Sequence, residues 1–176
     1  MVPAPTSDRL AFLHVQDGNE GGFIGGLLVV NGMGRPLEFH CTAPFLPTPT
    51  QRILYGTTLD SFVFCEQVGT ALIQQLKHRP RAILVQQARL LELAESSPWP
   101  WVWLPEQPGA EIQPLPIALR NQRLFTWDQR NAIVTGHETL LDDASAYCAA
   151  FGQRLPLDEP FERIRQALDL ALEQAR

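Results

Sequence analysis

The amino-terminal third of the chain consists of apolar runs separated by turn signals. Residues 10–16 and 23–31 are apolar stretches of strand length, and the glycine-rich segment 17–22 between them is typical of a turn. Residues 37–42 alternate strictly between apolar and polar side chains, which is the period of a half-buried strand. These segments predict an antiparallel meander whose apolar residues are mostly buried. The residues expected to be buried are Phe23, Leu27, Val29, Leu37 and Phe39.

The middle of the chain predicts a long helix followed by a short strand. Residues 43–50 contain three prolines, so no regular element is expected there. Apolar residues recur at helical spacing over 58–77, and Pro80 then ends the predicted helix. The apolar segment 82–85 predicts a strand, and the segment 88–94 predicts one or two turns of helix.

Residues 98–116 interrupt this pattern, because they contain six prolines and three tryptophans. Two helices are expected at the carboxyl end, one over 138–151 that ends at Gly152 and one over 158–175. The apolar stripe of the last helix must be covered, and we expect the chain's own sheet rather than a partner subunit to cover it. The short strand candidates in this half are residues 101–104, 111–113, 117–119, 124–127 and 132–134.

Together these elements predict an α+β fold. An N-terminal three-stranded antiparallel meander is packed by a long helix, and a proline-broken second β region and two C-terminal helices follow. We expect residues 1–8 to be a loose tail and residues 9–176 to be a single domain. The alternative is a pair of subdomains divided near residue 97.

Composition narrows the function classes. Nineteen acids against fourteen bases give a net charge of −5, which argues against a nucleic-acid partner, because nucleic-acid binders are usually basic. The three cysteines have no paired spacing, so we expect no disulfide, no metal site and no cofactor. No apolar run reaches the length of a membrane span, and the first residues do not resemble a signal peptide. We therefore expect a cytoplasmic protein.

The first candidate for catalysis is a pair of residues on the third predicted strand. Glu38 and His40 lie two residues apart and share a face, and His14 is expected on a neighbouring strand. A carboxylate beside an imidazole is suited to acid–base catalysis or to metal binding. The sequence names no third partner, and solvent-facing polar residues of a half-buried sheet explain the pair equally well.

Arginines and aromatics interleave in a later segment. Phe125 and Trp127 are flanked by Arg120, Arg123 and Arg130. In some proteins such an arrangement binds single-stranded nucleic acid through charge and base stacking. A second basic group is found at residues 77–81. The acidic character of the whole chain favours a solvated polar face as the simpler explanation.

The tryptophans are candidates for partner binding. Trp99, Trp101 and Trp103 share one face if their segment is extended, and tryptophan is enriched at interfaces. Packing against the chain's own sheet is the favoured alternative. His137, Glu138 and Asp142 also cluster, but acids at the start of a helix are stabilised by its dipole without any metal.

Our main hypothesis from the sequence is a non-catalytic protein-interaction or assembly module with a protein partner or a second copy of itself. This hypothesis rests on the absence of any catalytic motif, and under it the protein is not an enzyme. The alternative is a hydrolase or nuclease-like enzyme that uses Glu38 and His40 with a carboxylate from elsewhere. A second alternative is a nucleic-acid accessory factor that uses the arginine clusters.

Overall fold

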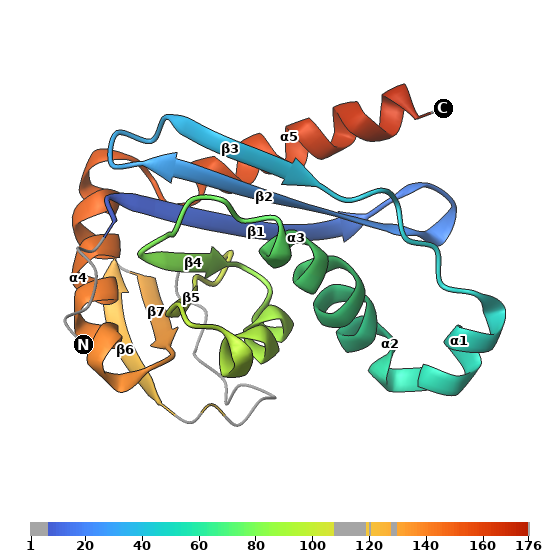
Figure 1. The fold of residues 1–176 in the computed structure, drawn as a ribbon, viewed down its shortest axis with the longest axis horizontal. Coiled ribbons are helices and arrows are strands. Elements are labelled where there is room, and N and C mark those ends of the chain that lie inside the picture. The colour runs from blue at the N-terminus through green and yellow to red at the C-terminus, as the bar shows by residue number, and fades with distance from the viewer. Residues whose placement is uncertain (1–6, 108–118, 120, 128–129, 176) are drawn as a thin grey trace.

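The computed structural model describes residues 7–107, 119, 121–127 and 130–175, and these form a mixed sheet covered by helices (Figure 1). The sheet has seven strands in the order β3-β2-β1-β4-β5-β7-β6. The strands are β1 (Arg9–Asp17), β2 (Phe23–Asn31), β3 (Pro36–Cys41), β4 (Ala82–Val85), β5 (Trp101–Trp103), β6 (Gln122–Trp127) and β7 (Arg130–Thr135).

Helices cover both faces of this sheet. On one face α4 and α5 bury the first core cluster, and on the other η3, α3 and η4 bury the second. The α-helices are α1 (Pro49–Tyr55), α2 (Leu59–Ser61), α3 (Thr70–Gln74), α4 (Glu138–Arg154) and α5 (Glu159–Gln174). The remaining helical segments are the 3-10 turns η1 (Asn19–Gly21), η2 (Gly56–Thr58) and η4 (Ala88–Ser96), and the π-helix η3 (Phe62–Gly69).

The predicted α+β class is confirmed, and the sheet is larger than the meander alone. β1, β2 and β3 form the expected antiparallel meander. β4 then pairs in parallel with β1, and β5 pairs in parallel with β4, because a helical crossover returns the chain to the sheet each time. β7 and β6 complete the sheet as antiparallel strands beside β5.

Two adjacent glycines allow helices to approach both faces of β2. A Cβ on Gly25 would lie 2.2 Å from Cγ1 of Val68 in η3, and one on Gly26 would lie 2.7 Å from Cγ2 of Ile164 in α5. Neither position leaves room for a side chain. The central strands are therefore buried on both faces, which explains their continuous apolar sequence.

The expectation that β3 is half-buried through Leu37 and Phe39 is wrong. Their exposed fractions are 38% and 39%, whereas Leu27 and Val29 on β2 are fully buried. β3 lies at the edge of the sheet, where the helices that cover β1 and β2 give less cover. Alternation along a strand indicates which residues share a face, but it does not indicate how far that face is covered.

The helix expected over 58–77 is also different in detail. It is divided into α2, η3 and α3, and it ends at Gln74. Within it the Thr70 hydroxyl donates to the Cys65 carbonyl, five residues earlier, at 2.8 Å. A Cβ on Gly69 would lie 2.6 Å from Cδ1 of Leu93 in η4. The absence of a side chain at this point of the π-helix therefore lets η4 pack closely against η3.

Gly152 does not end α4, which continues to Arg154. A Cβ on Gly152 would lie 1.6 Å from Nε1 of Trp127, so this glycine makes room for the indole of β6. The last helix, in contrast, agrees with the prediction. Its buried residues Phe161, Ile164 and Leu168 pack in the core against β1 and β2.

Two predicted features lie wholly or mostly outside the residues that the structure describes. The strand candidates at 111–113 and 117–118 fall among residues that the structure does not describe, as does most of the expected tail. Among the described residues, no helix combines the length and the apolar character that crossing a membrane requires.

Replacing Gly152 with alanine tests the contact between α4 and β6. We expect Gly152→Ala to destabilise the protein by about 1–3 kcal/mol, because the added methyl overlaps the Trp127 ring. Urea denaturation measures the change. In the double variant Gly152→Ala/Trp127→Leu the added cost of the alanine should largely disappear, and an equal cost in both backgrounds would contradict the contact.

Candidate functional site

The order of the strands identifies one end of the sheet as a candidate site. From β1 the chain proceeds to β2 and β3 on one side, and β4 and β5 lie on the other, so the order reverses between β1 and β4. In open sheets with parallel strands, ligands bind outside the carboxyl ends of the strands at such a reversal. We call this region the carboxyl edge. It is formed by the last residues of β1, the residues that follow β4 and β5, and the start of α5.

A side chain joins β1 and β4 where their backbone pairing ends. The last paired residues are Leu13 and Val85. Two positions further along both strands, Oε1 of Gln87 accepts from the N–H of Val15 at 3.1 Å, and its Nε2 donates to the Val15 carbonyl at 2.5 Å. The amide thus replaces a missing backbone partner, so the two strands stay together up to the site.

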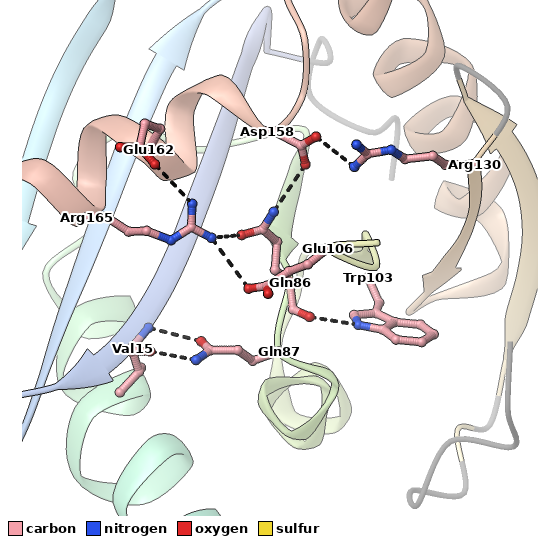
Figure 2. A network of polar contacts seen from close by, with 9 residues as sticks. All are labelled: Val15, Gln86, Gln87, Trp103, Glu106, Arg130, Asp158, Glu162 and Arg165. Atoms are coloured by element: carbon pink, nitrogen blue, oxygen red, sulfur yellow. Dashed lines mark hydrogen bonds and ion pairs between the residues drawn. The ribbon is translucent and has the colours of Figure 1, made fainter. Parts of the chain in front are cut away.

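Gln86 lies at the centre of the carboxyl edge and is 8% exposed. Its Nε2 donates to Asp158 at 3.1 Å, and its Oε1 accepts from Arg165 at 2.5 Å. The backbone carbonyl of Gln86 accepts from the indole N–H of Trp103 at 3.0 Å. Figure 2 shows these contacts converging on Gln86, with Trp103 of β5 at its backbone and Arg165 of α5 and Asp158 at its side chain. Every polar atom of the Gln86 side chain is therefore used, as a buried amide requires.

Ion pairs surround this amide. Asp158 also pairs with Arg130 of β7 at 2.7 Å. Arg165 extends toward Glu106 at 3.4 Å and toward Glu162 at 3.5 Å (Figure 2). Both arginines are partly accessible, since 16% of the Arg130 side chain and 31% of the Arg165 side chain are exposed. The carboxyl edge therefore presents guanidinium groups at the rim of a neutral, hydrogen-bonded centre.

His14 lies beside this centre, on the last part of β1. It faces α5, because its partner Gly26 meets Ile164 of that helix. The ring is 6% exposed, and its Nδ1 has no hydrogen-bond partner in the described part of the chain. Burial, and then the positive charge of Arg165, lower the pKa of His14 to about 4. The imidazole is therefore neutral at pH 7.

The arrangement suits hydrogen bonding to an anion better than metal binding. The described residues contain no group of three or more His, Cys, Asp or Glu side chains placed to hold a metal ion. At the carboxyl edge the carboxylates of Asp158 and Glu162 are engaged by arginines. Guanidinium groups offer paired N–H donors that match phosphate oxygens.

The structure does not bring Glu38, His40 and His14 together. Glu38 and His40 of β3 share the face of Leu27 and Val29, which is covered by η3 and α3, whereas His14 faces α5. Glu38 instead accepts from His40 Nε2 at 3.1 Å and from the backbone N–H of His78 at 3.0 Å. These contacts attach the edge strand to the loop after α3.

The Glu38 carboxyl keeps its charge in this position. Burial alone would raise its pKa, but hydrogen bonds from the backbone N–H of His78, from the His40 ring and from the Lys77 N–H outweigh burial and lower the pKa. Its side chain is 7% exposed. The carboxylate is thus already engaged in contacts that hold β3 to the loop after α3, and it does not face the solvent as the alternative expected.

The tryptophans are placed at different depths. Trp101 is fully buried in the core that contains η3 and η4, and Trp99 and Trp103 are partly buried against it. The indole of Trp103 reaches the carboxyl edge through its bond to Gln86. These contacts favour the chain's own core as the partner of this segment.

The predicted arginine cluster is divided. Arg130 lies in the carboxyl edge, whereas Arg123 pairs with Glu138 at 2.5 Å and with Asp142 on the outer side of α4. Arg120 lies outside the described residues. The acids at the start of α4 therefore bind an arginine side chain, and no metal is needed to explain their clustering.

Sequence reasoning missed Gln86, Asp158 and Arg165. The available signal was a polar pair, Gln86-Gln87, that follows directly after an apolar strand. Nothing in the sequence connects this pair with a helix more than seventy residues later. That contact depends on the path of the chain between β4 and α5.

Comparisons with known proteins place this geometry in a wider context. No protein-family model and no curated protein matches the sequence. The structure is similar to that of Ciona intestinalis endonuclease V in complex with a 23mer DNA that contains an inosine followed by a ribo-adenosine. The TM-score is 0.55 at 11% identity over 97% of this chain and 87% of that chain. The catalytic domain of human endonuclease V gives a TM-score of 0.46 at 13% identity over 95% of this chain and 85% of that chain.

At this level of identity the similarity to the Ciona enzyme establishes a shared fold. It nevertheless contradicts our main hypothesis of a non-catalytic protein-interaction or assembly module, since the structure that this chain resembles is that of an endonuclease. The expectation of a protein partner or homo-oligomer in place of a nucleic acid is corrected for the same reason, because one of these enzymes is bound to DNA. The nuclease-like alternative agrees better with the comparisons. The net charge misled the prediction because it averages over the whole surface.

The buried imidazole predicts a specific loss of stability in acid. Its pKa is about 4 in the folded protein and about 6.5 when unfolded, so the unfolded chain binds more protons between these values. His14 therefore contributes stability that is fully present above pH 6.5 and is lost as the pH falls toward 4. The size is about 3 kcal/mol at about 1.4 kcal/mol per pKa unit. Urea denaturation at several pH values should show a shallower slope for His14→Gln than for wild type, and parallel curves would contradict the assignment.

A second prediction concerns Glu38. Glu38→Ala leaves the N–H groups of Lys77 and His78 without their acceptor, and we expect a loss of about 2–3 kcal/mol at pH 7. Because its pKa is lowered in the fold, the contribution is present above the carboxyl's unfolded pKa and is lost as the pH falls through the folded pKa. Glu173→Ala, which removes an exposed carboxylate near the end of α5, is the control. Equal losses for both variants would show that Glu38 has no special role.

Proposed function

We propose that this protein acts on nucleic acid and that the carboxyl edge contacts the phosphodiester backbone. The observation that carries the proposal is the similarity of nearly the whole chain to an endonuclease solved in complex with DNA. In addition, ligands of such sheets bind at the carboxyl ends of the parallel strands. The second line uses the same fold as the first, and it indicates which end of the sheet the nucleic acid would meet.

The side chains of the edge support this proposal. Arg165 and Arg130 are partly accessible. Arg130 is oriented by Asp158, which the Gln86 amide also binds, and Arg165 is oriented by its hydrogen bond to Gln86. A guanidinium held in this way loses little conformational freedom when it donates to a phosphate.

Hydrolysis of the phosphodiester is the second candidate function, and the fold similarity favours it. Nucleases that use two metal ions hold them with clustered carboxylates. The described residues do not fit that arrangement, because Gln86 and His14 at the centre are neutral and the nearby carboxylates are paired with arginines. Recognition of nucleic acid is therefore the function that this edge supports best, and cleavage needs a direct assay.

Two further expectations are part of this proposal. Residues 9–176 would act as a single unit, and the protein would meet its nucleic acid in the cytoplasm. Both come from the sequence, and a cellular fractionation followed by detection of the native protein tests the second.

Binding is tested with fluorescein-labelled 20-nucleotide DNA and RNA, single-stranded and duplex, with and without one inosine. We expect the wild-type protein to raise the fluorescence anisotropy of at least one of these probes. Arg165→Gln should weaken binding about tenfold, because a charge-assisted hydrogen bond to phosphate is worth about 1.5–3 kcal/mol. The same probes, incubated with Mg²⁺ or Mn²⁺ and separated on a denaturing gel, report cleavage.

The matched control is Arg52→Gln. Arg52 of α1 is exposed, and its guanidinium donates to the Gly21 carbonyl at 2.8 Å, at the tip of the β1–β2 hairpin. We expect less than a twofold change for this variant. No binding to any probe, or equal effects of both variants, would rule out the proposed role of the carboxyl edge.

A further inference from the structure

The end of the molecule opposite the carboxyl edge is formed by several separate segments. Arg9, the first residue of β1, pairs with Asn31 at the end of β2, and its carbonyl accepts from the N–H of Arg81 at 2.8 Å. In the β2–β3 turn, a Cβ on Gly34 would lie 2.7 Å from Cδ2 of Leu155, which follows α4. Figure 1 shows the start of β1, the β2–β3 turn and α4 together at this end.

Cations collect on these segments. Four of them are exposed, and the fifth, Arg9, is half-buried. In the part of the chain that the structure describes, none of the five side chains forms an ion pair. We call this group the amino-end basic surface. It consists of Arg9, Arg35, Lys77, Arg79 and Arg154.

The acids at this end do not balance the surface. Asp143 pairs with Arg81 at 3.7 Å and Glu159 pairs with Arg163 at 2.6 Å, so two further arginines match these two acids. Asp8 accepts from Tyr147 and Glu38 accepts from backbone N–H groups, and these uncharged donors do not cancel the charge of a carboxylate. The five cations of the surface still outnumber these two carboxylates, which leaves an excess of positive charge.

Charges elsewhere in the described chain are distributed differently. Arg89 pairs with Asp60 at 2.5 Å, and the arginines of the carboxyl edge are paired as well. At the far end of β1, the hairpin to β2 carries Asp17 and Glu20. The net charge of −5 thus hides a strong separation, with a positive region at the amino end of β1.

We propose that the amino-end basic surface is a second contact for the nucleic-acid backbone, separate from the carboxyl edge. Cations spread over several loops suit a linear polyanion better than a small anion, which would need donors converging on one point. Four of the five are arginines, whose planar donors match phosphate oxygens. The inference rests on the proposed nucleic-acid partner, but it does not use the contacts of the carboxyl edge.

The test measures how binding depends on salt. Arg35→Gln/Arg79→Gln removes two exposed charges from two different loops, and neither side chain holds another element in place. With a fluorescein-labelled 20-mer duplex, each lost phosphate contact should reduce the slope of log K against log salt by about 0.9, and with a single strand by about 0.7. At about 50 mM salt we expect affinity to fall about tenfold.

Two controls separate a local contact from general charge. Arg52→Gln/Gln67→Glu changes the net charge by the same amount elsewhere on the surface, and we expect less than a twofold change in affinity. Arg35→Lys/Arg79→Lys keeps both charges and should retain nearly the wild-type slope. Thermal melts of all variants confirm that each remains folded.

The outcomes distinguish this inference from the proposed function. An effect of Arg165→Gln with none of Arg35→Gln/Arg79→Gln would overturn the inference and leave the carboxyl edge standing. The opposite pattern would support the basic surface and remove the carboxyl edge. Equal losses in Arg52→Gln/Gln67→Glu, or no binding of any oligonucleotide to the wild type, would overturn the inference. Poly-L-glutamate serves as a probe for an acidic protein partner. If it binds more tightly than the oligonucleotides, and if Arg35→Gln/Arg79→Gln abolishes that binding, the inference is overturned in favour of an acidic protein.

Discussion

Burial of β1 and β2 on both faces is the constraint on which the rest of the structure depends. Residues 10–13 of β1 are fully buried, and helices cover both sides of the strand pair. Gly25 and Gly26 make this possible, because any side chain there would overlap η3 or α5. The position of α5 follows, and with it the position of Asp158 and Arg165 beside the end of β4.

The same constraint decides the chemistry of the carboxyl edge. A buried charge must be paired, and His14 without a partner is therefore neutral. A buried amide must be hydrogen-bonded, and both polar atoms of the Gln86 side chain have partners. Charges appear only at the rim, where arginines and carboxylates hold one another. An edge built in this way can donate hydrogen bonds to an anion without the cost of burying an isolated charge.

Charge distribution gives the molecule two ends of different character. Paired arginines lie at the carboxyl edge, whereas the cations at the start of β1 form no ion pair with the residues that the structure describes. A total of −5 for the chain conceals this difference, since association with a polyanion depends on the local potential.

The sequence by itself determined the antiparallel meander, the class of the fold and the covered stripe of α5, because each depends on local periodicity. Only the tertiary structure decided that β3 is an exposed edge and that Gly152 accommodates Trp127 within a continuing helix. The carboxyl edge was hidden for the same reason. Gln86, Asp158 and Arg165 meet through strand order and helix placement, and the pattern of residues along the chain does not specify contacts between segments so far apart.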